Sequence, residues 1–177
     1  MSPSKNRVKA FLSSNKKITK GLEKENLRSD SDGKISNKKY PNALGKFHFN
    51  NHVTLDYSEP HLELVTPAFE DNTQLIIFLK NLHKFVESKI GDDRLWNYSM
   101  PPKFKKKFIN IPPFGESNIS KLAYLYRVGL RNRYGDKMQS TAGIHFNISF
   151  SKDIIEKLGV DKNEFYLGIC RNFLRVF

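Results

Sequence analysis

Five acidic residues in two short segments could together hold a metal ion. Glu23 and Glu25 lie in the segment GLEKENLR, and Asp56, Glu59 and Glu63 lie in LDYSEPHLELVTP. Residues two apart on a strand point to the same side, about 6.6–6.8 Å apart, so Glu23 and Glu25 share a face. Asp56 and Glu63 are an odd number of residues apart and would face opposite ways on an unbroken strand. Pro60 lies between them, and we predict a bulge or break there that restores a common side.

Carboxylates gathered on one sheet face repel one another unless a positive group lies among them. Mg²⁺ suits such a site, because it takes oxygen ligands and leaves coordination positions open for nucleotide phosphates. The alternative is that these acids pair with nearby Lys and Arg side chains on a solvated face, and the spacing does not decide between the two. The sequence does not indicate a zinc site, since no Cys/His cluster has the usual spacing.

The segment TAGIHFNISF (141–150) alternates apolar and polar residues with a period of two. This pattern predicts a strand with one buried face, formed by Ile144, Phe146 and Ile148. The polar side of that strand carries His145, Asn147 and Ser149. A histidine at the edge of an acidic cluster could add a nitrogen ligand or a hydrogen bond.

Other segments predict the elements that would position these groups. A strand beginning near Gly21 runs into an Asp-Gly turn, and residues 51–67 are predicted to be extended. Residues 71–93 predict a helix that Asp71 or Asn72 caps and Gly91 ends. The apolar positions of that helix are Leu75, Leu79, Leu82, Val86 and Ile90.

A second helix is predicted over residues 117–139, capped by Ser117 or Asn118. Its stripe of Leu122, Leu125, Tyr126 and Leu130 is of a kind that usually packs in a core. Residues 93–104 are predicted to be a loop, and two further helices are predicted near 151–159 and toward the end of the chain. Strands and helices mix without regular βαβ alternation, which favours an α+β fold with a largely antiparallel sheet.

The bulk properties limit the class of protein. A chain of 177 residues suits one domain, and no apolar run approaches the length of a membrane span. Residues 1–20 predict a basic helix or arm. The formal charge of +12 could attract nucleic acid, but the lysines show no repeated spacing, so we favour a generally solvated Lys-rich surface. A single cysteine, Cys170, fits a reducing cytoplasm.

Four segments, in order, resemble the N-terminal part of the proteobacterial glutamate–cysteine ligase (gamma-glutamylcysteine synthetase) family. GLEKENLR resembles the family's G-L-E-x-E-x-L-R, and LDYSEPHLELVTP resembles T-D-[FY]-x-E-x-x-L-E-x-[IV]-T-P. GDDRLWNYSMPP resembles G-D-E-x-x-W-x-x-S-M-P. The segment from FGESN to HFNIS resembles Y-G-x-S-N through R-Y-G-x-x-M-Q to G-[IV]-H-[YF]-N-x-S. Phe114, Ser120 and Pro60 depart from the family's usual residues at their positions.

The resemblance implies a fold similar to glutamine synthetase and a defined reaction. Such enzymes use ATP and Mg²⁺ to join the γ-carboxylate of L-glutamate to the amine of L-cysteine through a γ-glutamyl phosphate, the first step of glutathione biosynthesis. The implied metal ligands are Glu23, Glu25, Asp56, Glu63 and His145. The implied residues of the cysteine pocket are Tyr126, Leu130, Gln139 and Asn147.

Length is the main departure from the family. Family members continue far beyond the length of this chain, and the chain ends in an apolar helical segment, whereas termini tend to be polar and exposed. We therefore expect residues 21–177 to be the N-terminal part of the ligase catalytic domain, inactive without a C-terminal part that a separate chain could supply. A basic nucleic-acid-binding protein and an inert remnant of an enzyme are the alternatives.

Overall fold

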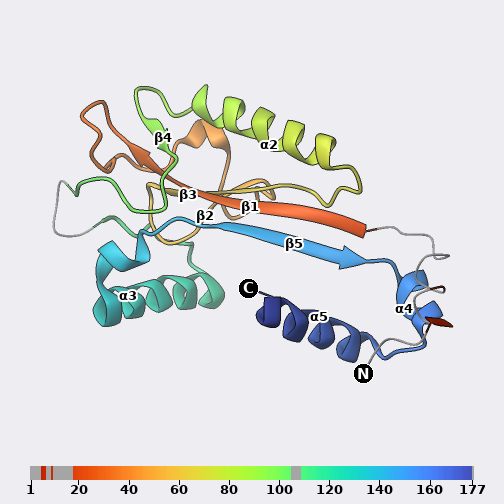
Figure 1. Ribbon diagram of the computed structural model, residues 1–177. Coiled ribbons are helices and arrows are strands. Elements are labelled where there is room, and N and C mark those ends of the chain that lie inside the picture. The colour runs from red at the N-terminus through yellow and green to blue at the C-terminus, as the bar shows by residue number, and fades with distance from the viewer. Residues whose placement is uncertain (1–4, 7–8, 10–17, 105–108, 177) are drawn as a thin grey trace.

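The computed structural model describes residues 5–6, 9, 18–104 and 109–176, and it has an α+β fold (Figure 1). The strands are β1 (Ile18–Ser29), β2 (Val53–Leu55), β3 (His61–Val65), β4 (Arg94–Trp96) and β5 (Ile144–Phe150). The helices are α2 (Asn72–Glu87), α3 (Asn118–Gln139), α4 (Lys152–Leu158) and α5 (Lys162–Val176), with a 3-10 turn, η1, at Asn42–Leu44.

One long strand, β1, organises the sheet. On one side it pairs with β3, which in turn pairs with β2. On its other side it pairs first with β5, through residues 18–24, and then with β4, through residues 27–29. All four pairings are antiparallel, as the sequence predicted. Because β1 is much longer than its partners, it is the only described strand that touches three others.

The core lies where α2 covers the sheet. Leu62 and Leu64 of β3 are fully buried and pack with Val86 of α2 and Ile90 just beyond it. The apolar stripe predicted for this helix therefore faces the core. The helix ends at Glu87, earlier than predicted, and Gly91 lies in the following turn with φ 64°. Ile90 still reaches the core from that turn.

The predicted break at Pro60 is confirmed, and it is larger than a bulge. Residues 56–60 form the turn of a hairpin between β2 and β3, in which Thr54 pairs with Glu63. The Asp56 amide donates to the His61 carbonyl oxygen across the turn (3.1 Å). Asp56 and Glu63 thus reach a common face because the chain reverses between them.

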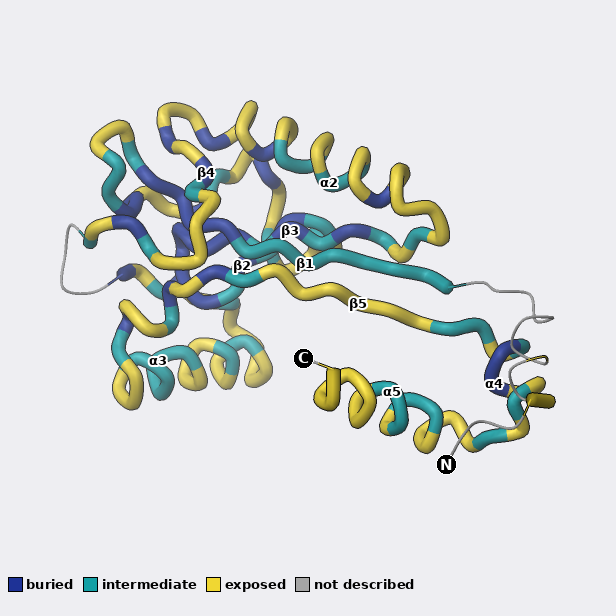
Figure 2. The backbone as a smooth tube through the Cα atoms, in the orientation of Figure 1, coloured by how far each residue is buried: buried dark blue, intermediate teal, exposed yellow. Residues whose placement is uncertain are grey.

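Two predictions of buried surface are wrong. Ile144, Phe146 and Ile148 of β5 are exposed by 62%, 59% and 43%, and Figure 2 shows β5 exposed along most of its length. On α3, the stripe members Leu122, Leu125 and Tyr126 are also exposed. The reason is coverage: α2 lies over β1 and β3, whereas β5 lies beyond it (Figure 1).

The sequence also predicted the conformation of residues 93–104, of the turn after β1 and of the N-terminal arm. The segment predicted as a loop at 93–104 contains the short strand β4. The predicted turn follows β1, where the Asp30 side chain accepts from the amides of Asp32 and Lys34. Residues 18–20 belong to β1, and most of the predicted N-terminal arm lies outside the described residues. Among the described helices, none combines the length and apolar character that crossing a membrane requires.

Candidate metal centre

The sheet register places the predicted ligands on one face. Directly paired residues of antiparallel strands share a face. Glu23 pairs with His145 of β5, and Glu25 pairs with Glu63 of β3. Since Glu23 and Glu25 are two residues apart on β1, all four side chains lie on the same side of the sheet. The pattern read from the sequence therefore describes a real cluster drawn from three strands.

Three of these residues bring ligand atoms close together. One atom each of Glu23, Glu63 and His145 lie within 4.8 Å of one another. The His145 ring also lies 3.1 Å (Nδ1) from Glu23 Oε2, and the Asn147 amide donates to Glu23 Oε1 (2.9 Å). Two carboxylates and an imidazole that converge in this way fit a divalent cation, because carboxylate oxygens are the ligands that Mg²⁺ prefers.

Glu25 and Asp56 lie at the inner end of the cluster. Glu25 Oε2 accepts from the Gly143 amide (2.7 Å), which ties β1 to the start of β5. Its other oxygen lies 3.9 Å from His145 Nε2. Between Glu25 and Asp56 stands the ring of His61, with its nitrogens 3.7 Å and 3.5 Å from the two carboxylates. All five predicted metal ligands thus belong to one connected group.

The carboxylates of the cluster repel one another, because too little positive charge lies near them to offset their own. Burial and the neighbouring carboxylates of Asp56, Glu23 and Glu25 raise the pKa of Glu63. Burial likewise raises the pKa of Asp56. The Glu23 carboxylate raises the pKa of His145, and the His61 ring lowers the pKa of Glu25. A bound cation would favour the ionised form of every carboxylate here.

A second network holds the turn that carries Asp56. The Arg127 guanidinium donates to the Asp56 carbonyl oxygen (2.7 Å) and lies over the Phe114 ring, 4.1 Å from its centroid. The next residue, Tyr57, donates its hydroxyl to the buried Asp136, which also accepts from Arg131. These bonds join the turn to α3, so helix and ligand are positioned together.

The four residues predicted for a cysteine pocket lie on α3 and β5. Tyr126 and Leu130 are one turn apart on α3, and Gln139 is its last residue, beyond an interruption at Gly135 (φ 78°). Asn147 is the member in contact with the metal cluster, through Glu23. Tyr126 is exposed, whereas Leu130 and Gln139 are partly buried.

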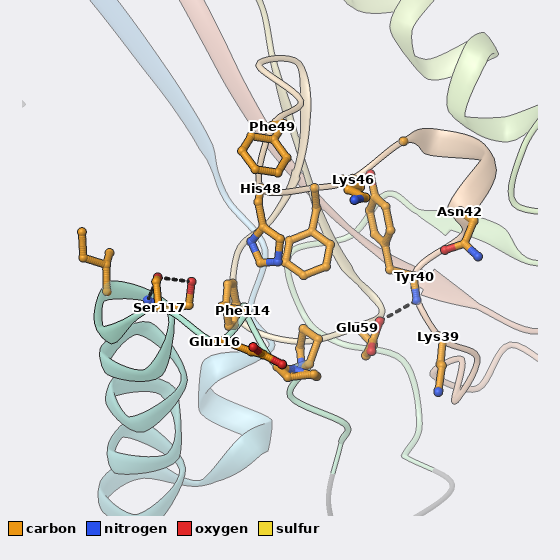
Figure 3. Close-up of a pocket in the computed structure, with 17 residues that line it drawn as sticks. Lys39, Tyr40, Asn42, Lys46, His48, Phe49, Glu59, Phe114, Glu116 and Ser117 are labelled. Atoms are coloured by element: carbon orange, nitrogen blue, oxygen red, sulfur yellow. Dashed lines mark hydrogen bonds between the residues drawn. The ribbon is translucent and has the colours of Figure 1, made fainter.

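A separate cavity of about 790 Å³ opens between residues 39–49 and the start of α3 (Figure 3). Its wall contains the rings of Phe47, His48 and Phe114, and the Glu59 carboxylate at its edge accepts from the Tyr40 amide. None of the predicted metal ligands or cysteine-pocket residues lines it, and Glu59 therefore lies apart from the other acids of its segment. Lysines and glutamates both line this cavity, so its charge favours no one kind of ligand.

Sequence reasoning missed His61. It follows Pro60 at the start of β3, and on a strand it shares the side of Glu63. That alternation was the available signal. It was not decisive, because the distance to Asp56 depends on the hairpin turn and the distance to Glu25 depends on the pairing of β1 with β3.

Comparisons with known proteins agree on one family. The glutamate–cysteine ligase family model matches residues 5–177. The glutamate–cysteine ligase of Pseudoalteromonas translucida is 43% identical over 169 residues, covering 89% of this chain and 32% of the relative. That of Wigglesworthia glossinidia brevipalpis is 42% identical, covering 89% of this chain and 30% of the relative. The chain spans about a third of the length of these curated relatives.

Solved structures show the same relationship. A glutamate–cysteine ligase from Francisella tularensis in complex with AMP has a TM-score of 0.85 and 33% identity, over 90% of this chain and 33% of that one. A bifunctional glutathione synthetase from Pasteurella multocida has a TM-score of 0.82 and 26% identity, over 96% of this chain and 23% of that one. With the family model matching nearly its full length, this chain belongs to the glutamate–cysteine ligase family.

Proposed function

We propose that this chain supplies the Mg²⁺-binding and amino-acid-binding sheet face of a glutamate–cysteine ligase, an ATP-dependent, ADP-forming carbon–nitrogen ligase. The observation that carries the proposal is the convergence of Glu23, Glu63 and His145 within 4.8 Å. Glu25 and Asp56 complete the ligand set. Support for a nucleotide comes from the family and from the AMP complex of the Francisella tularensis relative.

The proposed reaction has two steps. A γ-carboxylate oxygen of glutamate attacks the γ-phosphorus of ATP, and ADP leaves. The amine of cysteine then attacks the acyl carbon of the γ-glutamyl phosphate, and the carbon–oxygen bond to phosphate breaks as the amide bond forms. The proton that the amine loses leaves on inorganic phosphate. When bound, Mg²⁺ supplies positive charge that offsets the phosphate oxygens.

In that reaction, the residues of this chain are proposed to hold and orient the metal-binding carboxylates and the cysteine substrate. Asn147 and His145 fix the Glu23 carboxylate from two sides, and the Gly143 amide fixes Glu25. Tyr126, Leu130, Gln139 and Asn147 are proposed to receive cysteine. Such fixed geometry is the main protein contribution to phosphoryl transfer.

Metal binding by the chain tests the first half of the proposal. Mn²⁺ is a spectroscopic substitute for Mg²⁺, and electron paramagnetic resonance measures its dissociation constant. We expect Glu23→Gln and Glu63→Gln each to weaken Mn²⁺ binding by about tenfold or more, because each removes a charged ligand. Glu116→Gln, at an exposed acid outside the cluster, is the control. Wild-type chain that binds no Mn²⁺ up to millimolar concentration refutes the metal site.

The apolar back of β5 supports a further polypeptide partner. Ile144, Phe146 and Ile148 are exposed on the face opposite the acidic cluster, beyond the cover of α2. In the Pseudoalteromonas translucida relative, the part that this chain does not match is about twice as long as the part that it matches. We propose that polypeptide corresponding to that additional part packs on this surface, as a separate C-terminal half chain or as further residues of the same protein.

Measurements of turnover test the proposal that a further polypeptide is needed. The chain alone is expected to release no ADP above background with glutamate, cysteine, ATP and Mg²⁺, because phosphoryl transfer needs groups on both sides of the nucleotide. Adding the remaining two-thirds of the Pseudoalteromonas translucida relative is expected to restore ADP release, and Glu63→Gln should abolish it. Full turnover by the chain alone would contradict the need for a partner.

Since ATP and amino acids are cytoplasmic metabolites and Cys170 is unpaired, we propose that the reaction takes place in the cytoplasm.

A further inference from the structure

His61 is buried at the inner end of the metal cluster with neither ring nitrogen in a hydrogen bond. Its exposed fraction is 0%, and both Nδ1 and Nε2 lack a hydrogen-bond partner. Buried polar atoms in native proteins nearly always have a partner, and each exception needs an explanation. A purely apolar side chain would fill the same space without that cost.

Each nitrogen of the ring faces a different carboxylate. Nε2 lies 3.7 Å from Glu25 Oε2, and Nδ1 lies 3.5 Å from Asp56 Oδ2. A hydrogen bond between nitrogen and oxygen has a length of about 2.7–3.2 Å, so either contact is less than about 1 Å too long. Glu25 belongs to β1 and Asp56 to the β2–β3 turn, so one ring spans two segments that are separate in sequence.

The family resemblance does not account for this histidine. In the motif T-D-[FY]-x-E-x-x-L-E, position 61 is one of the unspecified positions, whereas Asp56, Glu59 and Glu63 are the specified acids. His61 is therefore outside the ligand set that the resemblance implies, although it stands between two members of that set.

We propose that His61 is a positioning residue, which holds the Glu25 and Asp56 carboxylates at a set separation so that an incoming divalent cation meets an ordered ligand set. The inference rests on the proposed metal site. Groups that contact metal ligands from behind orient them, and losing such a group typically costs about 10–100-fold in metal affinity. The burial of the ring and its place between the carboxylates suit this role.

A merely space-filling role makes the opposite prediction. Replacing His61 by leucine would remove two buried nitrogens that lack hydrogen-bond partners and keep a similar volume, and metal affinity would stay unchanged. Mn²⁺ affinity therefore separates the two roles where thermal stability alone does not.

The test compares His61→Leu and His61→Gln with wild type, and uses His83→Leu on α2, across the sheet, as the control. Dissociation constants for Mn²⁺ come from electron paramagnetic resonance, and melting temperatures are measured without metal. We expect His61→Leu to bind Mn²⁺ about tenfold more weakly. His61→Gln should lose less, because its amide can donate to one of the two carboxylates. His83→Leu should keep the wild-type affinity.

Wild-type Mn²⁺ affinity in a folded His61→Leu variant overturns the proposal. If that variant does not fold, His61→Gln decides: weaker binding than wild type supports the role, and equal binding overturns it. Failure of the wild-type chain to bind Mn²⁺ is a different result, because it removes the metal site itself. Wild-type binding combined with unchanged His61→Leu binding removes only the role of His61.

Discussion

The carboxylates at the candidate metal centre repel one another when no cation lies among them. Glu63 shows this most clearly, since burial and three neighbouring acids raise its pKa. A group whose pKa is higher in the folded chain than in the unfolded chain weakens folding as pH rises through that interval. The residues best suited to hold a metal are therefore a cost to the metal-free fold.

We predict that Glu63→Gln stabilises the metal-free chain at pH 7.5. The amide keeps the size of the side chain and removes its repulsion with Asp56, Glu23 and Glu25. The melting temperature of the metal-free variant should lie about 2 °C above that of metal-free wild type. Added Mg²⁺ should raise the melting temperature of wild type but not that of the variant. A variant that melts below wild type without metal would contradict this account.

His83 is expected to make the fold sensitive to acid. It lies on the sheet-facing side of α2, where burial and Lys24 lower its pKa from 6.5 to about 4. Because the folded pKa is the lower one, the unfolded chain takes up this proton first. The stability contributed by neutral His83 is complete above pH 6.5 and is lost as pH falls toward 4.

We predict that His83→Gln flattens the decline of stability between pH 6.5 and pH 4. Urea unfolding at half-unit pH steps measures the free energy of unfolding over this range. Asn81→Gln, at an exposed position of the same helix, should keep the wild-type slope. Equal slopes for His83→Gln and wild type would show that this histidine does not carry the effect.

Among the elements, α2 supplies most of the cover for the sheet, and its start is well capped. The Asp71 carboxylate accepts from the Gln74 amide (2.7 Å), as an N-cap residue does. The predicted cap and apolar stripe are both confirmed, because each depends on local spacing along one helix. The earlier end at Glu87 was missed, since the turn that follows is set by packing of Ile90 into the core.

We predict that Asp71→Ala lowers the free energy of unfolding by about 1 kcal/mol. The loss should appear in urea unfolding as a lower midpoint with an unchanged slope. Asp71→Asn keeps an accepting oxygen and should lose only a small part of this. A loss of equal size in both variants would indicate that charge, rather than the hydrogen bond, is responsible.

For the molecule as a whole, the distribution of burial is uneven. The acidic face and the core under α2 are ordered by contacts within the chain, whereas the back of β5 and much of α3 are exposed (Figure 2). Exposed apolar side chains gathered on one surface mark an interface. This surface is the one we propose to be covered by further ligase polypeptide.

We predict that Phe146→Lys impairs assembly with the complementary two-thirds of a relative. A charged side chain on that surface would be buried without a partner, so co-elution in size-exclusion chromatography should be reduced at least about tenfold. Phe49→Lys, at an aromatic residue exposed on a loop, should assemble as wild type does. Equal assembly by Phe146→Lys and wild type would place the interface elsewhere.

The sequence alone determined which side chains share a face, because alternation along Glu23–Glu25 and His145–Asn147 is a local property of strands. It also located a break at Pro60 and the family, but it did not predict that the chain reverses there. Only the tertiary structure decided that β1 pairs Glu23 with His145 and Glu25 with Glu63, which brings the acids together, and that His61 lies between two of them. It also decided that the apolar side of β5 is uncovered, since burial depends on which distant element packs there and periodicity carries no information about that.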